Sequence, residues 1–384
     1  MAIKRIVIAP DSFKESMTAK QAATAIAQGF REVFQDAVDL ELIPMADGGE
    51  GTMQSLADAL NGTIYQQTVT GPLGEAVQAS YAISGDQSTA IIEMAEASGL
   101  ALVPQEKRNP MRTTSFGTGE LVKAALDHGV TKIILGIGGS ATNDGGAGMI
   151  EALGGVFYSN AYRTIDRGGG QLLDLVDIDT THIDSRLNHV EFIVASDVDN
   201  PLLGPDGASV VFGPQKGADE EMVAKLDHAL CHYHRILKKV TGKNVKDIPG
   251  AGAAGGLGAS LLAFFDAKLE PGIDIVLHET NFHDRMKDAA FVITGEGKID
   301  GQTIYGKTPV GVAKAAKQHR ANVIALCGTL GRDYEKVYAH GIDAVFSIAE
   351  GPGSLADALQ NGARYLEALA RNVAQVIFLS ENSV

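Results

Sequence analysis

The order of apolar runs along the chain constrains its fold more than any other feature. Near the N-terminus, residues 6–9 and 40–43 predict two buried strands, each followed by a helical pattern, and Thr18 and Gln21 form a T-x-x-Q capping box. The alternation returns near the C-terminus, with strands expected at 291–294, 322–326 and 344–348 and helices at 310–319 and 334–340. This alternation predicts an α/β fold with a doubly wound, mostly parallel sheet of the flavodoxin or Rossmann type.

The middle of the chain has a different layout. Residues 63–69 and 77–83 predict paired strands joined by the turn-rich segment 71–74, and further α/β pieces follow. We therefore predict two domains. Residues 1–62 and 286–384 form a discontinuous doubly wound domain, and residues 63–285 form an inserted α/β domain that carries the main glycine-rich loops.

Composition excludes several classes of function. The chain has 384 residues, a formal net charge of −15 and a pI near 5.1, so its field repels nucleic acids and anionic membranes. There is no signal-peptide pattern and no apolar run of membrane-spanning length, which predicts a cytoplasmic protein. Cys231 and Cys327 lack metal-ligand spacing and are expected to be buried thiols.

One glycine-rich segment is typical of an anion-binding loop. The sequence GIGGSATNDGGAG, from Gly136 to Gly148, follows an apolar strand pattern and leads into a helical pattern. Backbone N–H groups approach a phosphate closely where side chains are absent, and a helix N-terminus adds donors. The alternative is an ordinary glycine-rich turn. The predicted nucleotide or phosphate contacts are Gly138, Gly139, Ser140, Thr142, Asn143, Asp144 and Gly145, with Gly255 and Gly256 from a second glycine-rich segment.

Polar residues directly after predicted strands are the strongest candidates for catalysis. In open α/β sheets, ligands bind at the carboxyl ends of the strands. Asp197 follows such a strand and is our first choice for a general base; an Asx turn explains Asp199 but explains Asp197 less well. Lys14 can contact a phosphate or carboxylate, and Asp47 and Glu296 can hold Mg²⁺ or substrate. The alternatives are a polar helix-entry loop with a solvated lysine for Lys14, turn and N-cap chemistry for Asp47, and a solvated turn for Glu296.

Three further patterns look functional, and we interpret them as accidental. Residues 301–308, GQTIYGKT, match a phosphate-binding P-loop, but the predicted strand ends near Thr294 and Pro309 follows directly, although Lys307 can still touch phosphate. Residues 250–255, GAGAAG, lack a good preceding strand, so close packing or nucleotide approach explains them better than a dinucleotide fingerprint. Histidines 228, 232 and 234 favour a packed or solvated helix face over a metal site.

Taken together, the segments resemble the type-1 glycerate kinase family of bacteria. The resemblance rests on IAPDSFKESMTA at 8–19, ADGGEGT at 46–52, VTGPLGE at 69–75, TTSFGTGEL at 113–121, GIGGSATNDGGAGM at 136–149, NPL at 200–202, FGPQKGA at 212–218, PGAGAAGGLGA at 249–259 and VITGEGKID at 292–300. It implies ATP- and Mg²⁺-dependent phosphorylation of D-glycerate, with an active-site cleft between two α/β domains. Enterobacterial members act on the 2-hydroxyl and give 2-phospho-D-glycerate.

The resemblance also suggests roles for individual residues. Asp197, Lys14 and Asp47 are the expected catalytic residues, and Asp197 and Glu296 are the expected metal ligands. The expected substrate contacts are Ser12, Gly48, Gly49, Glu50 and Lys298. Phe116 stands where close relatives can carry arginine, so we give it no role. The alternatives are a kinase of another small hydroxy acid, a kinase forming 3-phosphoglycerate, an NAD-dependent hydroxyacid dehydrogenase and a non-catalytic sugar-acid sensor.

Overall fold

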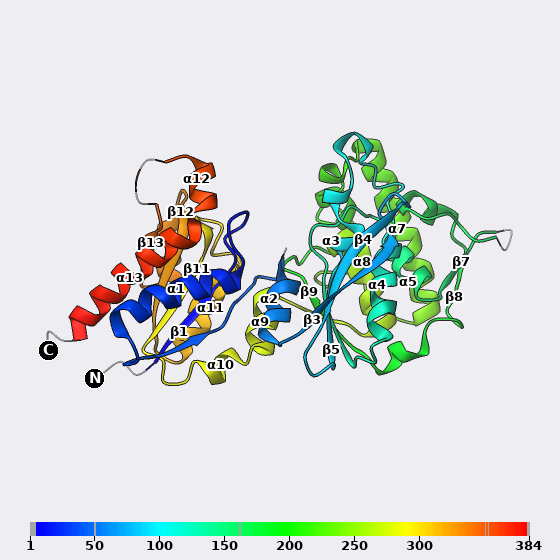
Figure 1. Cartoon of the computed structure of the whole chain (residues 1–384). Helices are drawn as coiled ribbons and strands as arrows, with labels where there is room; N and C mark the ends of the chain where they lie inside the picture. The colour runs from blue at the N-terminus through cyan, green and yellow to red at the C-terminus, as the bar shows by residue number, and fades with distance from the viewer. Residues whose placement is uncertain (1–4, 50, 161–162, 350, 352, 382–384) are drawn as a thin grey trace. The chain divides into compact units, whose positions relative to one another are not determined.

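The chain folds as two compact units in the computed structural model, which describes residues 5–49, 51–160, 163–349, 351 and 353–381 (Figure 1). The described residues of unit 1 fall within 1–47, 54–60 and 271–384, and those of unit 2 fall within 48–53 and 61–270. No helix in the described part of the chain is long and apolar enough to cross a membrane.

Unit 1 is built on a five-stranded parallel sheet. Its strands are β1 (Arg5–Pro10), β2 (Asp39–Leu42), β11 (Phe291–Ile299), β12 (Asn322–Leu330) and β13 (Ala344–Ser347). The order across the sheet is β13-β12-β11-β1-β2, and all four pairings are parallel. This is the flavodoxin-like order 2-1-3-4-5, in which the direction of winding reverses between β1 and β11. The prediction of a doubly wound parallel sheet is confirmed.

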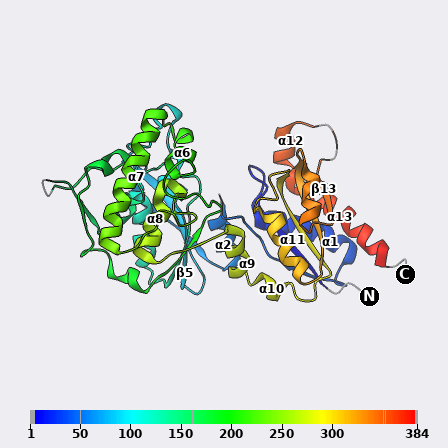
Figure 2. The same ribbon diagram turned by 180° about the vertical axis from the view of Figure 1, so that it is seen from behind.

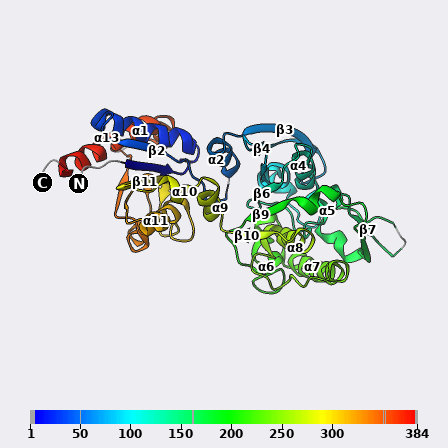
Figure 3. The same ribbon diagram turned by 90° about the horizontal axis from the view of Figure 1, so that it is seen from below.

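Helices cover both faces of this sheet. Figure 3 shows α1 (Ala19–Phe34) and α13 (Gly362–Glu381) on one face and α11 (Thr308–Gln318) on the other. The Thr18 side chain accepts a hydrogen bond from the Gln21 N–H and the Gln21 side chain accepts one from the Thr18 N–H, so the capping box that predicted α1 is present. The remaining helices of this part of the chain are α2 (Thr52–Ala59), α9 (Gly272–Glu279), α10 (Phe282–Arg285) and α12 (Leu355–Gln360).

Unit 2 has a six-stranded mixed sheet. The order is β10 (Lys268–Glu270), β9 (Glu191–Ala195), β6 (Lys132–Gly136), β5 (Thr89–Glu93), β4 (Ala76–Ile83) and β3 (Thr63–Thr70). The first four strands are parallel, whereas β3 and β4 form the predicted antiparallel hairpin. A short ribbon of β7 (Val156–Tyr158) and β8 (Asp177–Asp179) is separate from this sheet.

The helices of unit 2 share one hydrophobic core with its sheet. They are α3 (Ala95–Ser98), α4 (Phe116–Leu126), α5 (Ala147–Ala152), α6 (Ala208–Phe212), α7 (Glu220–Thr241) and α8 (Ala253–Phe265). In Figure 2, α7 and α8 lie side by side. Gly136 pairs with Glu93 of β5 and with Ala195 of β9, so the loops after β6 and β9 begin at the same edge of the sheet.

Some elements differ from the expected ones. Residues 334–340 form a 3₁₀-helix instead of an α-helix, and it ends at Gly341, which has φ of 99°. Helix α9, which the prediction placed in the inserted domain, packs against α11 of unit 1. Cys327 is buried as expected, but Cys231 is exposed because it lies on the polar side of the amphipathic helix α7.

Candidate functional site

A cavity of about 220 Å³ lies in unit 2, where the loops after β6 and β9 meet. The cavity is lined by residues 48–49, 137–140, 195–198 and 253–254, with Phe212, Gln215 and Lys216. In a parallel arrangement, loops at the carboxyl ends of neighbouring strands face the same space, which is where open α/β sheets bind ligands. This cavity therefore brings together the glycine loop and Asp197.

Only the first half of the glycine loop faces the cavity. Gly138, Gly139 and Ser140 line it, and a Cβ atom built on Gly138 would meet no other atom within 4 Å. The second half is buried: the exposed fractions of Thr142, Asn143 and Asp144 are 0%, 0% and 1%. The backbone donors available to a ligand in this cavity are thus those of the first half.

The carboxylate of Asp144 accepts hydrogen bonds from backbone N–H groups that we expected to bind a ligand anion. It accepts hydrogen bonds from the backbone N–H groups of Ser115, Gly146 and Gly148 at 2.8, 3.2 and 3.4 Å, and from the Ser115 hydroxyl at 2.9 Å. These donors belong to the starts of α4 and α5. Burial raises the pKa of Asp144, and the hydrogen bonds act in the opposite direction. Asp144 therefore shapes the loop from within.

The glycines of the second segment pack against the same loop. The N–H of Gly145 donates to the carbonyl oxygen of Gly255 at 3.0 Å, and a Cβ atom on Gly255 would lie 2.0 Å from the carbonyl oxygen of Thr142. Gly256 has φ of 89° and lies close to Gly145. Close packing, one of the two accounts given by the sequence, describes these positions in the structure.

Lys216 is a residue of this cavity that the sequence did not single out. Its Nζ donates to the Ser140 Oγ at 2.8 Å and to the Thr142 carbonyl oxygen at 2.7 Å, and its exposed fraction is 2%. Burial lowers the pKa of Lys216 to about 7, and the charge of Asp144 opposes that shift. The available signal was a lysine enclosed by glycines, in the sequence from Gly213 to Gly217.

The backbone is strained at one edge of the cavity. Ala254 has φ of 53° and ψ of 40°, in the left-handed region that residues with a Cβ atom rarely adopt. Such residues are held in place by the surrounding structure and concentrate at functional sites. Asp197 is exposed at the cavity wall. Gly48 and Gly49 also line the cavity, whereas Glu50 lies outside the described residues.

Unit 1 carries a second group of polar residues at its switch point. Pro10 pairs with Gly295, so Asp11, which follows β1, lies beside Glu296, which is within β11. The Thr308 hydroxyl donates to Asp11 Oδ2 at 2.5 Å, and Lys307 Nζ lies 3.5 Å from Glu296 Oε2. This is the position at which flavodoxin-like sheets bind ligands.

Both carboxyl groups hold their protons more tightly than usual. Burial raises the pKa of Asp11 to about 6, and the negative charge of Asp47 adds to the effect. Burial also raises the pKa of Glu296 to about 7; Asp11 adds to it, while Lys307 and Thr303 oppose it. Among the described residues there is no group of three histidine, cysteine, aspartate or glutamate side chains that could hold a metal.

The sequence analysis predicted that the strand before residues 301–308 ends near Thr294, and this prediction was wrong. Strand β11 continues to Ile299 and therefore does lead into residues 301–308, with α11 beginning at Thr308. The strand is longer because β12 pairs with it as far as Ile299↔Leu330. The lysine and threonine of the pattern, Lys307 and Thr308, contact carboxylates of the chain.

Lys14 and Lys298, two other predicted residues of unit 1, line different cavities. Lys14 is exposed and lines a cavity of about 630 Å³ together with Gly297. The N–H of Ser12 donates to Asp11 Oδ1 at 2.6 Å. Lys298 forms an ion pair with Asp300 at 2.8 Å and faces a different, open pocket.

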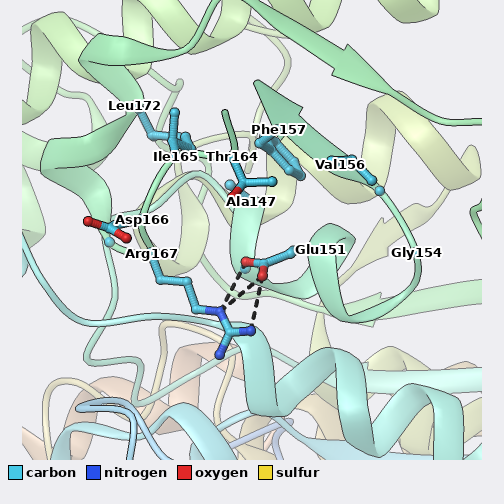
Figure 4. A pocket seen from close by; sticks show the side chains of 13 residues that line it. Ala147, Glu151, Gly154, Val156, Phe157, Thr164, Ile165, Asp166, Arg167 and Leu172 are labelled. Atoms are coloured by element: carbon cyan, nitrogen blue, oxygen red, sulfur yellow. Dashed lines mark hydrogen bonds and ion pairs between the residues drawn. The ribbon is translucent and has the colours of Figure 1, made fainter. Parts of the chain in front are cut away.

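A further cavity of unit 2, of about 310 Å³, surrounds Arg167 (Figure 4). The guanidinium group of Arg167 forms hydrogen bonds of 3.0–3.2 Å with both carboxylate oxygens of Glu151, and it lies 3.3 Å from the centre of the Phe116 ring. No predicted site residue lines this cavity. The ring of Phe116 thus packs against the guanidinium group of Arg167.

Comparison with known proteins shows the family of the chain. The model of the glycerate kinase family matches residues 6–378. The chain belongs to the glycerate kinase family. It is 59% identical over 371 residues to the glycerate kinase of Halalkalibacterium halodurans, covering 97% of both chains. It is 52% identical to the glycerate 2-kinase of Escherichia coli, covering 97% of this chain and 98% of the relative.

The chain is also similar in three-dimensional structure to a solved protein of this kind. The crystal structure of a protein assigned as glycerate kinase 2 from Salmonella typhimurium LT2 superposes with a TM-score of 0.92. The two chains are 49% identical, and the match covers 99% of this chain and 100% of the other. The family resemblance read from the sequence is confirmed, and with it the α/β fold.

Proposed function

We propose that this chain transfers the terminal phosphoryl group of ATP to the 2-hydroxyl of D-glycerate, giving 2-phospho-D-glycerate and ADP. Membership of the glycerate kinase family supports the reaction, and the relative from Escherichia coli named glycerate 2-kinase supports the position of transfer. The observation that carries the proposal is the cavity of unit 2, which unites a glycine loop with a strand-end carboxylate. We place the reaction in the cytoplasm.

Asp197 is the proposed general base. Phosphoryl transfer needs positioning and charge stabilisation more than covalent chemistry. The carboxylate of Asp197 orients the 2-hydroxyl of glycerate and accepts its proton as the new O–P bond forms and the bond between the γ-phosphorus and the bridging oxygen breaks. The N–H groups of Gly138 to Ser140 stabilise the charge that develops on the phosphoryl oxygens.

Lys14 and Asp47 keep their proposed catalytic roles, and Ser12, Gly48, Gly49, Glu50 and Lys298 keep their proposed substrate contacts. The other predicted phosphate contacts are buried or tightly packed, so we propose that they stabilise the phosphate-binding loop without touching the ligand. They are Thr142, Asn143, Asp144, Gly145, Gly255 and Gly256. Their contribution is to hold the loop in shape, which still affects phosphate binding.

Mg²⁺ is the proposed metal cofactor. This ion prefers oxygen ligands, keeps several waters, and is usually held by one or two carboxylates together with substrate phosphates. Glu296 and Asp11 fit such a site because burial raises the pKa of both, the charge of Asp11 raises the pKa of Glu296 further, and a nearby cation would oppose these shifts. When bound, Mg²⁺ neutralises phosphate charge. Asp197 remains the proposed metal ligand of unit 2.

The deciding experiment is phosphorus NMR of the purified protein with MgATP and D-glycerate. We expect a 2-phosphoglycerate signal. A 3-phosphoglycerate signal would correct the position of transfer, and no phosphoglycerate from folded protein would reject glycerate as the substrate. Other small hydroxy acids would then be screened, and NADH oxidation and ATP-independent binding would test the dehydrogenase and sensor alternatives.

The same assay tests the proposed base. Asp197→Asn should lower kcat by a factor on the order of 10²–10⁴, because a general base typically contributes that much. Asp199→Asn is the matched control, since Asp199 is an exposed neighbour on the same loop that does not line the cavity. Near-normal turnover by folded Asp197→Asn would contradict the assignment.

A further inference from the structure

We propose that Lys216 is the cation of the unit 2 cavity and binds the anionic oxygens of a ligand held against Gly138, Gly139 and Ser140. The inference deepens the proposed function, on which it rests for the identity of the anion. The carboxylate of glycerate and the phosphates of the nucleotide share this chemistry, and the experiment below separates them.

The ammonium group of Lys216 is buried between neutral hydrogen-bond partners. A buried ammonium group is costly unless it is paired, yet both hydrogen-bond partners of Lys216 in the described structure, the Ser140 hydroxyl and the Thr142 carbonyl oxygen, are neutral. Asp144 is the negative group whose charge acts on Lys216, but its carboxylate oxygens bind the starts of α4 and α5. An anion in the cavity would complete the pairing.

The ammonium group of Lys216 has more donors than its two protein partners use. A lysine ammonium group has three N–H donors, and two of them are used by Ser140 and Thr142. Lys216 lines the cavity, so the third is available to a ligand there. Burial also lowers the pKa of Lys216 to about 7, and a bound anion would restore its positive charge.

The surroundings of Lys216 suit a small anion. Gly138 leaves open space in front of the loop, and Ala254 is held in the strained left-handed conformation at the cavity wall. A cavity of about 220 Å³ is smaller than the roughly 300–1,000 Å³ of pockets for drug-sized ligands. It suits a small acid or a phosphate group and is too small for a whole nucleotide.

Substitution of the lysine tests the inference by ligand binding. Thermal unfolding is measured for the wild type, Lys216→Met and the surface control Lys225→Met, each with inorganic phosphate, ADP or D-glycerate. Lys225 is exposed and pairs with Glu221 one turn away on α7. We expect Lys216→Met to weaken binding of the anion roughly 10- to 100-fold, the range of a charged hydrogen bond, and Lys225→Met to leave it unchanged.

The pattern across ligands identifies the anion. Loss confined to D-glycerate would assign Lys216 to the carboxylate, and loss confined to phosphate and ADP would assign it to the phosphates. Wild-type affinity for all three ligands in folded Lys216→Met would overturn the inference, while turnover in the NMR assay would leave the proposed function standing.

A second measurement needs no variant. The wild-type protein is acetylated with acetic anhydride, and the modification of each lysine is followed by mass spectrometry with and without ligand. We expect phosphate, ADP or D-glycerate to slow the acetylation of Lys216 at least 10-fold and to leave Lys225 unaffected. Equal acetylation of Lys216 with and without every ligand would overturn the inference. Protection of Lys216 in a protein that makes no phosphoglycerate would reject the proposed function alone.

Discussion

Glu296 is a buried acidic residue, and Asp11 beside it is half-buried; their protonation links the stability of unit 1 to pH. The pKa of Glu296 is raised from 4.5 to about 7 in the folded state. Between these values the folded protein binds more protons than the unfolded chain, so the free energy of unfolding falls as the pH rises. The cost of the charge is fully present above pH 7 and absent below pH 4.5.

Glu296→Gln should therefore stabilise the protein at high pH. We expect a gain of about 1–3 kcal/mol in the free energy of unfolding at pH 8.5, shrinking towards pH 5, because glutamine carries no charge to bury. Urea unfolding at several pH values in the presence of EDTA measures this. Glu335→Gln, on the exposed surface of unit 1, is the control. A loss of stability at pH 8.5 would show that the ion pair with Lys307 outweighs burial.

Individual site residues could be predicted only where the chain itself marks the ends of strands. Asp197 and Gly138 were found because each follows an apolar run, and the structure places both at one cavity. Lys216 was missed because it lies in the 3₁₀ turn Pro214–Lys216, whose burial depends on segments far away in the sequence. The burial of Asp144 depends in the same way on Ser115.

At the scale of elements, the contact of α4 with α5 depends on the absence of a side chain. A Cβ atom on Gly119 would lie 2.4 Å from the carbonyl oxygen of Met149 and 2.7 Å from the Cβ atom of Ala152. These two helices hold the residues that bind Asp144, so their spacing also fixes the glycine loop. Gly138, in contrast, faces open space.

Gly119→Ala and Gly138→Ala should separate stability from ligand binding. We expect Gly119→Ala to lower the free energy of unfolding by about 1–3 kcal/mol, because the added methyl group overpacks the helix contact. Gly138→Ala should leave stability nearly unchanged and weaken phosphate binding. Urea unfolding and phosphate titration measure both effects. A stable Gly119→Ala variant would show that the two helices can move apart without cost.

The element predictions succeeded where a local signal was present. The capping box at Thr18 and Gln21 marked the start of α1, and alternation marked the hairpin of β3 and β4. The length of β11 was underestimated because Gly295 and Gly297 interrupt its apolar run, and only pairing with β12 extends the strand beyond them.

At the scale of the whole molecule, each unit has a hydrophobic core of its own. Phe30, with an exposed fraction of 0%, belongs to the core of unit 1, while Tyr233, also 0% exposed, belongs to that of unit 2. The described core residues of α1, α13 and the unit 1 strands form one cluster. Damage to one core should therefore be felt mainly in its own unit.

Phe30→Ala tests this separation. Removing the ring should cost about 3–5 kcal/mol in the stability of unit 1. We expect hydrogen exchange, followed by mass spectrometry, to accelerate in peptides of β1, α1 and α13 and to change much less in peptides of β6 and α8. Equal acceleration in both units would show that they unfold as a single cooperative body.

The architecture of the whole chain was largely predictable. The doubly wound parallel sheet of unit 1 was predicted from the alternating strand and helix patterns. Its strand order was not predicted, because no local signal shows where β11 joins the sheet after the chain returns from unit 2. The active-site cleft between domains, implied by the family resemblance, stays a prediction.

The buried side chain of Asp144 lowers the conformational entropy that the glycine loop loses when a ligand binds. Since the Asp144 side chain already binds the N–H groups at the starts of α4 and α5, the glycine loop is held in its fold before any substrate arrives. A preorganised loop loses little conformational entropy when a ligand binds. More of the interaction energy then remains for discriminating between the ground state and the transition state of the reaction.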